Sequence, residues 1–130
     1  MPLLLKLKPK ESVIMGGTLI RNGETPCRLS VENRVPILRE KDIMQESDAT
    51  SHCRRIYFLL QLMYLEQKRV KEHYDVYLGL VKDLIKAAPS MVEMLYSISE
   101  HVLADEFYKA LKVARRLVDR EDELLGQVKI

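Results

Sequence analysis

Apolar and polar positions alternate over short segments in the first third of the chain. Five such segments occur, at residues 3–8, 12–15, 18–21, 27–32 and 36–40. In the fourth, "CRLSVE", Cys27, Leu29 and Val31 share one side, whereas Arg28, Ser30 and Glu32 share the other. A two-residue period is typical of strands that bury one face. We therefore expect five strands before residue 41.

Glycine-containing turns separate these strands. The pair Gly16-Gly17 can adopt positive φ at little steric cost, which suits a tight hairpin between the second and third strands. The dipeptide Asn22-Gly23 is the strongest short hairpin signal in the chain. Five short strands bury too little apolar surface to be stable alone. We expect the sheet to pair with a second copy, to pack on the rest of the chain, or to do both.

After residue 47 the apolar positions recur at intervals of three and four, as in amphipathic helices. Thr50 or Ser51 can cap a first helix that runs to about Gln67. The middle of this helix is apolar nearly all round, which predicts a buried central helix. A second helix, beginning near Val70, should end before Pro89.

Two further helices complete the pattern. Ser90 and Glu93 have the spacing of a capping box at the start of the third helix. Asp105 can cap the fourth, and Gly126 is a plausible stop. The sequence "DREDELL" that precedes this glycine is expected to be a solvated helix end, or else a contact for a basic partner.

These elements predict an α+β fold. A small five-stranded antiparallel sheet over residues 1–46 would precede a bundle of about four helices over residues 47–130. With 47% hydrophobic and 31% charged residues, the composition is that of a folded protein. The net charge of +2 arises in the first module, which has eight Lys or Arg and six Asp or Glu. This excess favours an anionic partner there.

Candidate catalytic chemistry is sparse. Cys27 and Cys53 are too few for a disulfide framework, and we expect buried free thiols. His52, His73 and His101 do not occur at the spacing of a metal motif. We therefore expect neither an enzyme nor a bound cofactor.

Membrane insertion is not expected either. The longest apolar stretch, residues 56–65, is interrupted by Gln61 and is shorter than the roughly 20 residues that span a bilayer. The lysines in "MPLLLKLKPK" break the apolar run that a signal peptide needs. A soluble, cytoplasmic protein is the expectation.

Basic residues occur on the first and last predicted strands. Lys6, Lys8 and Lys10 lie on the first strand or its turn, and Arg39 and Lys41 lie on or just after the last. If these strands are neighbours, the cations form one ridge that suits the phosphates of single-stranded RNA. Basic edge strands also occur simply because they prevent aggregation.

Several stretches resemble the FlbT family of flagellar biosynthesis repressors, most densely over residues 1–66. They are "MPLLLKLKP", "NG", "ILREKDIMQ", "ATS" and "YFLLQLMYL". One departure is His52, where the family often has proline. The resemblance implies binding to the 5′ untranslated leader of flagellin mRNA and control of its translation or lifetime. It also implies a small helical partner, FlaF.

Residues 1–43 are also similar in element order to the CsrA family of RNA-binding regulators, through "IMGG" and "ILRE". That resemblance implies a dimer of interleaved strands. It places RNA contacts at Leu5 to Lys8 and at Arg39. Lysines stand here where arginine is usual, and lysine lacks the planar fork that reads a guanine edge.

The resulting hypothesis is a post-transcriptional repressor of flagellin synthesis that performs no chemistry on RNA. Its RNA-binding residues would be Lys6, Lys8, Arg39 and Lys41, with Leu5 on the same strand. We expect a homo-oligomer. The alternative is an adaptor that does not bind RNA, in which the sheet only dimerises and the helices bind FlaF or another assembly factor.

Overall fold

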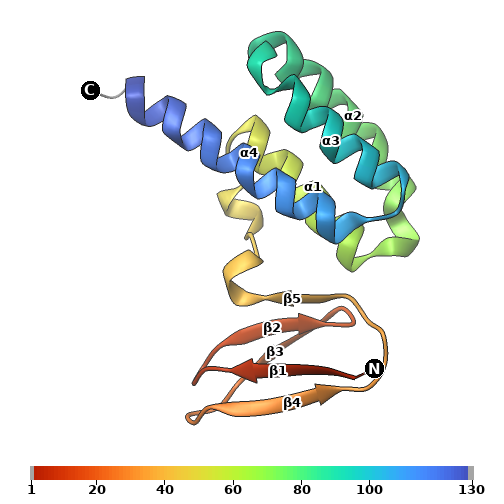
Figure 1. The fold of residues 1–130 in the computed structure, drawn as a ribbon, viewed down its shortest axis with the longest axis vertical. Coiled ribbons are helices and arrows are strands. Elements are labelled where there is room, and N and C mark those ends of the chain that lie inside the picture. Colours follow the sequence, from red (N-terminus) through yellow and green to blue (C-terminus); the bar gives the residue numbers. More distant parts are fainter. Residues whose placement is uncertain (1, 129–130) are drawn as a thin grey trace. The chain divides into compact units, whose positions relative to one another are not determined.

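The computed structural model describes residues 2–128, with side chains described to residue 126. The chain divides into two compact units, residues 1–43 and 44–130. Strands occupy the first unit and helices the second (Figure 1). The α+β fold class expected from the sequence is confirmed.

The described residues of the first unit form five strands, within one or two residues of their predicted positions. They are β1 (Leu3–Leu7), β2 (Ser12–Met15), β3 (Thr18–Arg21), β4 (Cys27–Val31) and β5 (Ile37–Arg39). All pairings are antiparallel. The strands form two sheets, a two-stranded sheet β1–β4 and a three-stranded sheet β3–β2–β5, and not one continuous sheet.

The turn between β2 and β3 is the hairpin that the sequence predicts. Met15 pairs with Thr18, so only Gly16 and Gly17 form the loop. Their φ values are 57° and 84°. Two successive residues with positive φ match the twist of a two-residue hairpin, and glycine adopts this conformation at the least steric cost.

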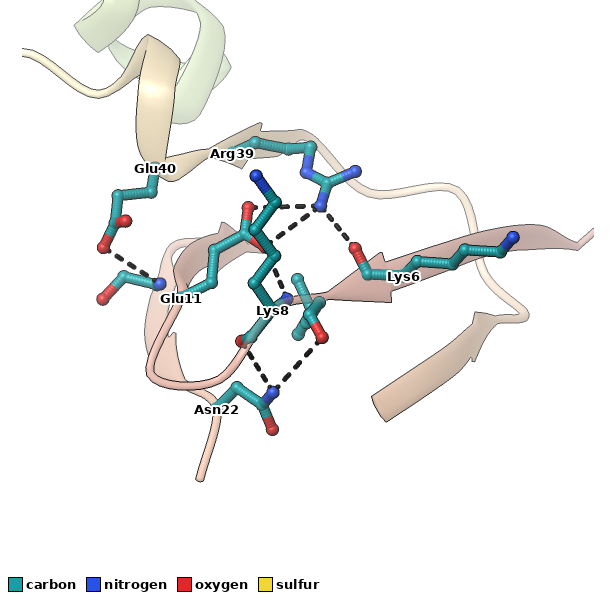
Figure 2. Close-up of polar contacts among 8 residues, drawn as sticks. Lys6, Lys8, Glu11, Asn22, Arg39 and Glu40 are labelled. Atoms are coloured by element: carbon teal, nitrogen blue, oxygen red, sulfur yellow. Dashed lines mark hydrogen bonds and ion pairs between the residues drawn. The ribbon is translucent and has the colours of Figure 1, made fainter. Parts of the chain in front are cut away.

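The hairpin predicted at Asn22-Gly23 is wrong, because β3 and β4 lie in different sheets. The side-chain amide of Asn22 instead donates to the carbonyl of Lys8 at 2.8 Å (Figure 2) and to that of Thr25 at 2.9 Å. The asparagine thus satisfies carbonyls of the connecting loops. The turn takes the chain from one sheet to the other.

Side chains of β1 alternate as the pattern requires. Leu5 and Leu7 are buried, whereas Leu4 and Lys6 are exposed. The other fully buried apolar side chains of this unit are Val13 and Leu38. Because Leu5 and Leu7 are buried on one face of β1, Lys6 lies on the opposite, exposed face.

The second unit contains four α-helices in its described part. They are α1 (His52–Leu65), α2 (Val70–Ala87), α3 (Val92–Leu103) and α4 (Phe107–Val128). The 3₁₀ turns η2 (Glu46–Asp48), η3 (Gln67–Arg69) and η4 (Pro89–Met91) precede α1, α2 and α3, and η1 (Glu40–Asp42) follows β5 in the first unit. Ile56, Tyr57, Leu60 and Met63 of α1 are at most 1% exposed, which confirms that the interior of this helix is buried.

The start of α1 is capped as predicted and the start of α3 is not. The Ser51 hydroxyl accepts a hydrogen bond from the backbone N–H of Arg54 at 3.2 Å. Ser90 and Glu93 form no capping box, since α3 has no side-chain cap. Pro89 instead begins the 3₁₀ turn η4, which continues into α3 and satisfies backbone amides itself.

Asp105 ends α3 and does not cap α4. Its φ is 58°, its N–H donates to Val102 at 3.1 Å, and the N–H of Glu106 donates to His101 at 2.8 Å. These two bonds make a Schellman motif with aspartate in the left-handed position. The predicted stop at Gly126 is also wrong, because α4 continues to Val128.

Two acidic residues of "DREDELL" are anchored, contrary to the expectation of a solvated helix end. The Ser51 hydroxyl and the guanidinium of Arg54, the latter at 3.6 Å, contact Glu121. Arg54 also donates to Asp122 at 2.9 Å. A carboxylate beside the first turn of α1 is favourable, because that end of a helix carries partial positive charge. The acidic run therefore ties α4 to the beginning of α1.

Candidate nucleic-acid interface

The ladder between β1 and β4 brings two cations directly opposite each other. Lys6 pairs with Arg28, and both side chains are exposed. Like charges that face each other across an antiparallel pair destabilise it. Among the residues that the structure describes, neither cation has an ion pair. A bound anion would relieve this repulsion.

Arg39, at the end of β5, reaches across to β1. Its Nη2 donates to the backbone carbonyl of Lys6 and lies 3.1 and 3.2 Å from the two carboxylate oxygens of Glu11 (Figure 2). The Arg39 side chain is 35% exposed and that of Glu11 is 13% exposed. All three contacts use Nη2, so they fix the guanidinium while part of it stays accessible.

Glu11 was not predicted as a site residue, although it organises this end of the strand unit. Its carboxylate accepts from the backbone N–H of Lys8 at 2.9 Å. That hydrogen bond is the largest cause that lowers the pKa of the Glu11 carboxyl, and the Arg39 guanidinium lowers it further. Glu11 is therefore ionised at neutral pH and holds Arg39 against β1.

An open pocket of about 470 Å³ lies beside this ion pair. Its lining consists of Lys8, Pro9, Glu11, Arg39, Glu40 and Lys41. Glu40 is itself engaged, because its carboxylate accepts from the N–H of Ser12 at 3.2 Å. Three cations against two carboxylates make this a mixed-charge pocket with a small positive excess.

The expected ridge of adjacent first and last strands is rearranged. In the described residues β1 and β5 share no ladder. The side chain of Arg39 on β5 instead donates a hydrogen bond to the backbone carbonyl of Lys6 on β1. Lys8, Arg39 and Lys41 line one pocket, whereas the Lys6 side chain extends away from the Arg39 guanidinium (Figure 2). Lys6 belongs instead to the outer face of β1–β4.

The side chain of Leu5 is 6% exposed and part of the core, and its contact with RNA stays a prediction. Arg28 takes a place that the prediction missed. The alternation of "CRLSVE" had set Arg28 on the polar side of its strand, but only the pairing of β1 with β4 brings it to Lys6. We call Lys6, Lys8, Arg28, Arg39 and Lys41 the cationic surface.

The described part of the chain shows neither a metal cluster nor a membrane-spanning helix. No group of three or more His, Cys, Asp or Glu side chains could hold a metal ion there. No helix in this part combines the length and apolar character that a bilayer span requires. Cys53 is a buried free thiol whose pKa rises to about 12, mainly through burial, so it is a poor nucleophile.

The fold and this surface define a small α+β protein with exposed cations on its strand unit. Comparison with known families then identifies the kind of protein. A family model described as "Flagellar protein FlbT" matches residues 3–125. The chain belongs to the FlbT family.

Relatives resemble the chain over nearly its whole length. A "Probable flagellum biosynthesis repressor protein FlbT" of Rhodopseudomonas palustris is 42% identical over 98% of this chain and 100% of its own. The "Flagellum biosynthesis repressor protein FlbT" of Caulobacter vibrioides is 38% identical over 98% of this chain and 92% of its own. No solved structure matches the chain. The likeness of residues 1–43 to the CsrA family therefore stays a prediction.

Proposed function

We propose that this protein represses flagellum biosynthesis by binding the 5′ untranslated leader of flagellin mRNA in the cytoplasm. The repressor role follows the names of its relatives. Support for an RNA ligand comes from one observation above all. On the exposed face of β1–β4 the cations Lys6 and Arg28 lie opposite each other, and neither has an ion pair with any residue that the structure describes. A chain of phosphates is an anion long enough to contact both of them and the pocket beside Arg39.

In this proposal the residues of the cationic surface have two different roles. Lys6, Lys8, Arg28 and Lys41 contact phosphates, which supply affinity and set the register of the RNA. Arg39 reaches a base, because Glu11 fixes its planar guanidinium in one orientation while part of the group stays exposed. The occupied leader then excludes the ribosome or exposes the message to nucleases. No covalent bond changes.

A salt titration tests the proposal. Each phosphate contact to a single strand contributes about −0.7 to the slope of log affinity against log salt, so four contacts predict about −3. Purified protein should bind its own flagellin leader with that slope. Replacing Lys6 and Arg28 together by alanine should make the slope shallower by about 1.4.

A matched control removes two exposed lysines of α2, by Lys71→Ala with Lys86→Ala. This variant has the same net charge as the strand variant but lacks no residue of the cationic surface. Its slope should equal that of the unmodified protein. A slope near zero, or equal slopes for the strand variant and the control, would contradict RNA binding at this surface.

Oligomerisation is part of the same proposal. β1 and β4 form a sheet of only two strands, so each has an edge without a ladder partner in the described residues. Leu4 and Leu19 are 74% and 66% exposed. We propose that a second copy covers part of this strand unit. The molar mass measured by light scattering at several protein concentrations distinguishes a dimer from a monomer.

A second candidate function is an adaptor that binds FlaF or another flagellar assembly protein and no RNA. The observation that favours it lies in the helical unit, where Tyr96 and Leu103 of α3 are 68% and 74% exposed. Large exposed apolar side chains in one row are typical of protein contact surfaces. Tight binding of a helical protein, together with RNA binding that lacks the salt slope, would favour the adaptor.

A further inference from the structure

Helix α3 exposes an apolar row that the other described residues of the helical unit leave uncovered. Val92, Tyr96 and Leu103 are 44%, 68% and 74% exposed. Other residues of the same helix pack in the core, where Leu95, Ile98 and Val102 are buried. α3 and α4 pack against each other within the unit. The exposed row therefore adjoins the core face of α3, with Leu95 and Val102 beside it.

The spacing of the row is that of a helix-pairing seam. Val92, Tyr96, Ser99 and Leu103 are separated by four, three and four residues, the interval of alternate core positions in a heptad. At 1.5 Å per residue the row is about 16 Å long, or about three helical turns. The Ser99 hydroxyl is held by Tyr77 at 2.8 Å, so the polar position of the seam is satisfied within the unit.

Two carboxylates flank this seam. Glu93 and Glu100 each follow a seam residue directly, and both are exposed. Within the described residues neither carboxylate has an ion pair. Charges in such flanking positions select the partner of a paired helix, and opposite charges are preferred. A helix that covers the seam should therefore carry Lys or Arg beside Glu93 and Glu100.

A second copy of α3 is a poor occupant. Leu95 and Val102, which flank the other side of the seam, are buried and uncharged. Two seams packed on each other would therefore offer no cation to Glu93 or Glu100, and in the antiparallel arrangement glutamates would face glutamates. Like charges across a paired interface disfavour it. The charges thus favour a different protein over self-association.

We propose that the seam of α3 docks an amphipathic helix of a partner protein, whose apolar residues recur at intervals of three and four and are flanked by basic residues. The interface is one helix face of about three turns, so the complex belongs to the small, transient class. This inference does not depend on RNA binding, because every residue in it belongs to the helical unit.

Two synthetic peptides of three heptads provide the probe. Both carry leucine at the two core positions of each heptad, and their flanking positions are lysine in one and glutamate in the other. Fluorescence anisotropy measures the binding of each labelled peptide to the full-length protein. We expect saturable one-to-one binding of the lysine peptide, and binding of the glutamate peptide that is weaker by tenfold or more.

Variants of the seam sharpen the test. Leu103→Ser and Tyr96→Ser should each weaken binding of the lysine peptide by about tenfold, through loss of buried apolar area. Reversing the flanking charges by Glu93→Lys with Glu100→Lys should transfer the preference to the glutamate peptide. Val76→Ser removes an apolar side chain of α2 that is 55% exposed and should change nothing. All five changed residues are exposed, and circular dichroism verifies that each variant is folded.

Three results would overturn the inference. One is equal affinity for the two peptides. Another is binding of the lysine peptide that Leu103→Ser and Val76→Ser weaken alike, which would mean a general attraction to the protein surface. The third is a lower molar mass of the protein alone after Leu103→Ser, because the seam would then be a contact between copies of this chain.

Discussion

At the scale of single residues, the site depends on how one guanidinium is held. Arg39 stands at the end of a three-residue strand, where a long side chain has many conformations. Its Nη2 contacts Glu11 and the carbonyl of Lys6, which belong to a different part of the strand unit. The cluster of charge at the end of β5 is thus more than a solvated junction, because one of its cations is built into the unit.

Replacing Arg39 separates its two roles. Arg39→Ala should weaken binding to the flagellin leader by about 1–3 kcal/mol if the guanidinium contacts a base. Arg39→Lys keeps the charge but loses the planar fork, so it should retain phosphate attraction and lose discrimination between leader sequences. Competition binding with leaders that differ at single bases measures this discrimination.

Glu11→Gln is the companion variant. It removes the charge that fixes Arg39 and leaves Arg39 itself in place. We expect discrimination between bases to fall while the salt slope stays the same. Equal losses of affinity for all leaders, with no change in discrimination, would mean that Arg39 acts only as a charge.

At the scale of elements, local pattern and long-range pairing behave differently. Strand and helix positions follow from periodicity, which neighbouring residues determine, and they agree with the structure within one or two residues at most ends. Which strand pairs with which is a long-range property. The Asn22-Gly23 signal pointed to a β3–β4 hairpin, but the amide of Asn22 satisfies carbonyls across the unit. Because strand pairing is a long-range property, the local pattern also does not predict that Lys6 lies opposite Arg28.

The link between α3 and α4 shows a similar limit. Aspartate is favoured both as an N-cap and, among non-glycine residues, in the left-handed conformation, so Asp105 fitted either end. The backbone settles the choice, because Asp105 has positive φ and its N–H bonds back to α3. Similarly, Ser90 does not cap α3, because the 3₁₀ turn that Pro89 begins leads into this helix.

Asp105 therefore gives a stability prediction. Asp105→Gly should raise the free energy of unfolding by up to about 1 kcal/mol, because glycine adopts the left-handed conformation at less cost. Asp105→Val should lower it by about 1–2 kcal/mol, since a β-branched residue is strained there. Urea denaturation followed by circular dichroism measures both.

Ala104→Gly is the matched control one residue earlier, where φ is −91°. Glycine gains nothing from its freedom at this position and should leave the free energy of unfolding unchanged or lower it. If Asp105→Gly lowered the free energy of unfolding as much as Ala104→Gly does, the left-handed conformation of Asp105 would not be a cost that glycine relieves.

At the scale of the whole molecule, two units of different construction belong to one family. The family match extends from residue 3 to residue 125 and so includes both. The relative from Rhodopseudomonas palustris is matched over its full length. The strand unit and the helical unit therefore occur together in these proteins, and the proposals assign a different partner to each, RNA to the first and a basic helix to the second.

The opposed cations of β1 and β4 have a consequence for turnover. Repulsion between Lys6 and Arg28 destabilises the β1–β4 ladder when no anion is bound. A bound anion should stabilise the strand unit, because a ligand that binds only the native form stabilises that form. We expect the flagellin leader to slow cleavage of the strand unit by chymotrypsin, which does not cut at Lys6 or Arg28. It should slow cleavage less in Arg28→Ser, which lacks both the repulsion and one phosphate contact. If adding the leader left the rate of digestion unchanged, stabilisation of the strand unit by the leader would be excluded. If the leader is the ligand as proposed, protein without bound RNA would be cleaved before protein that holds it.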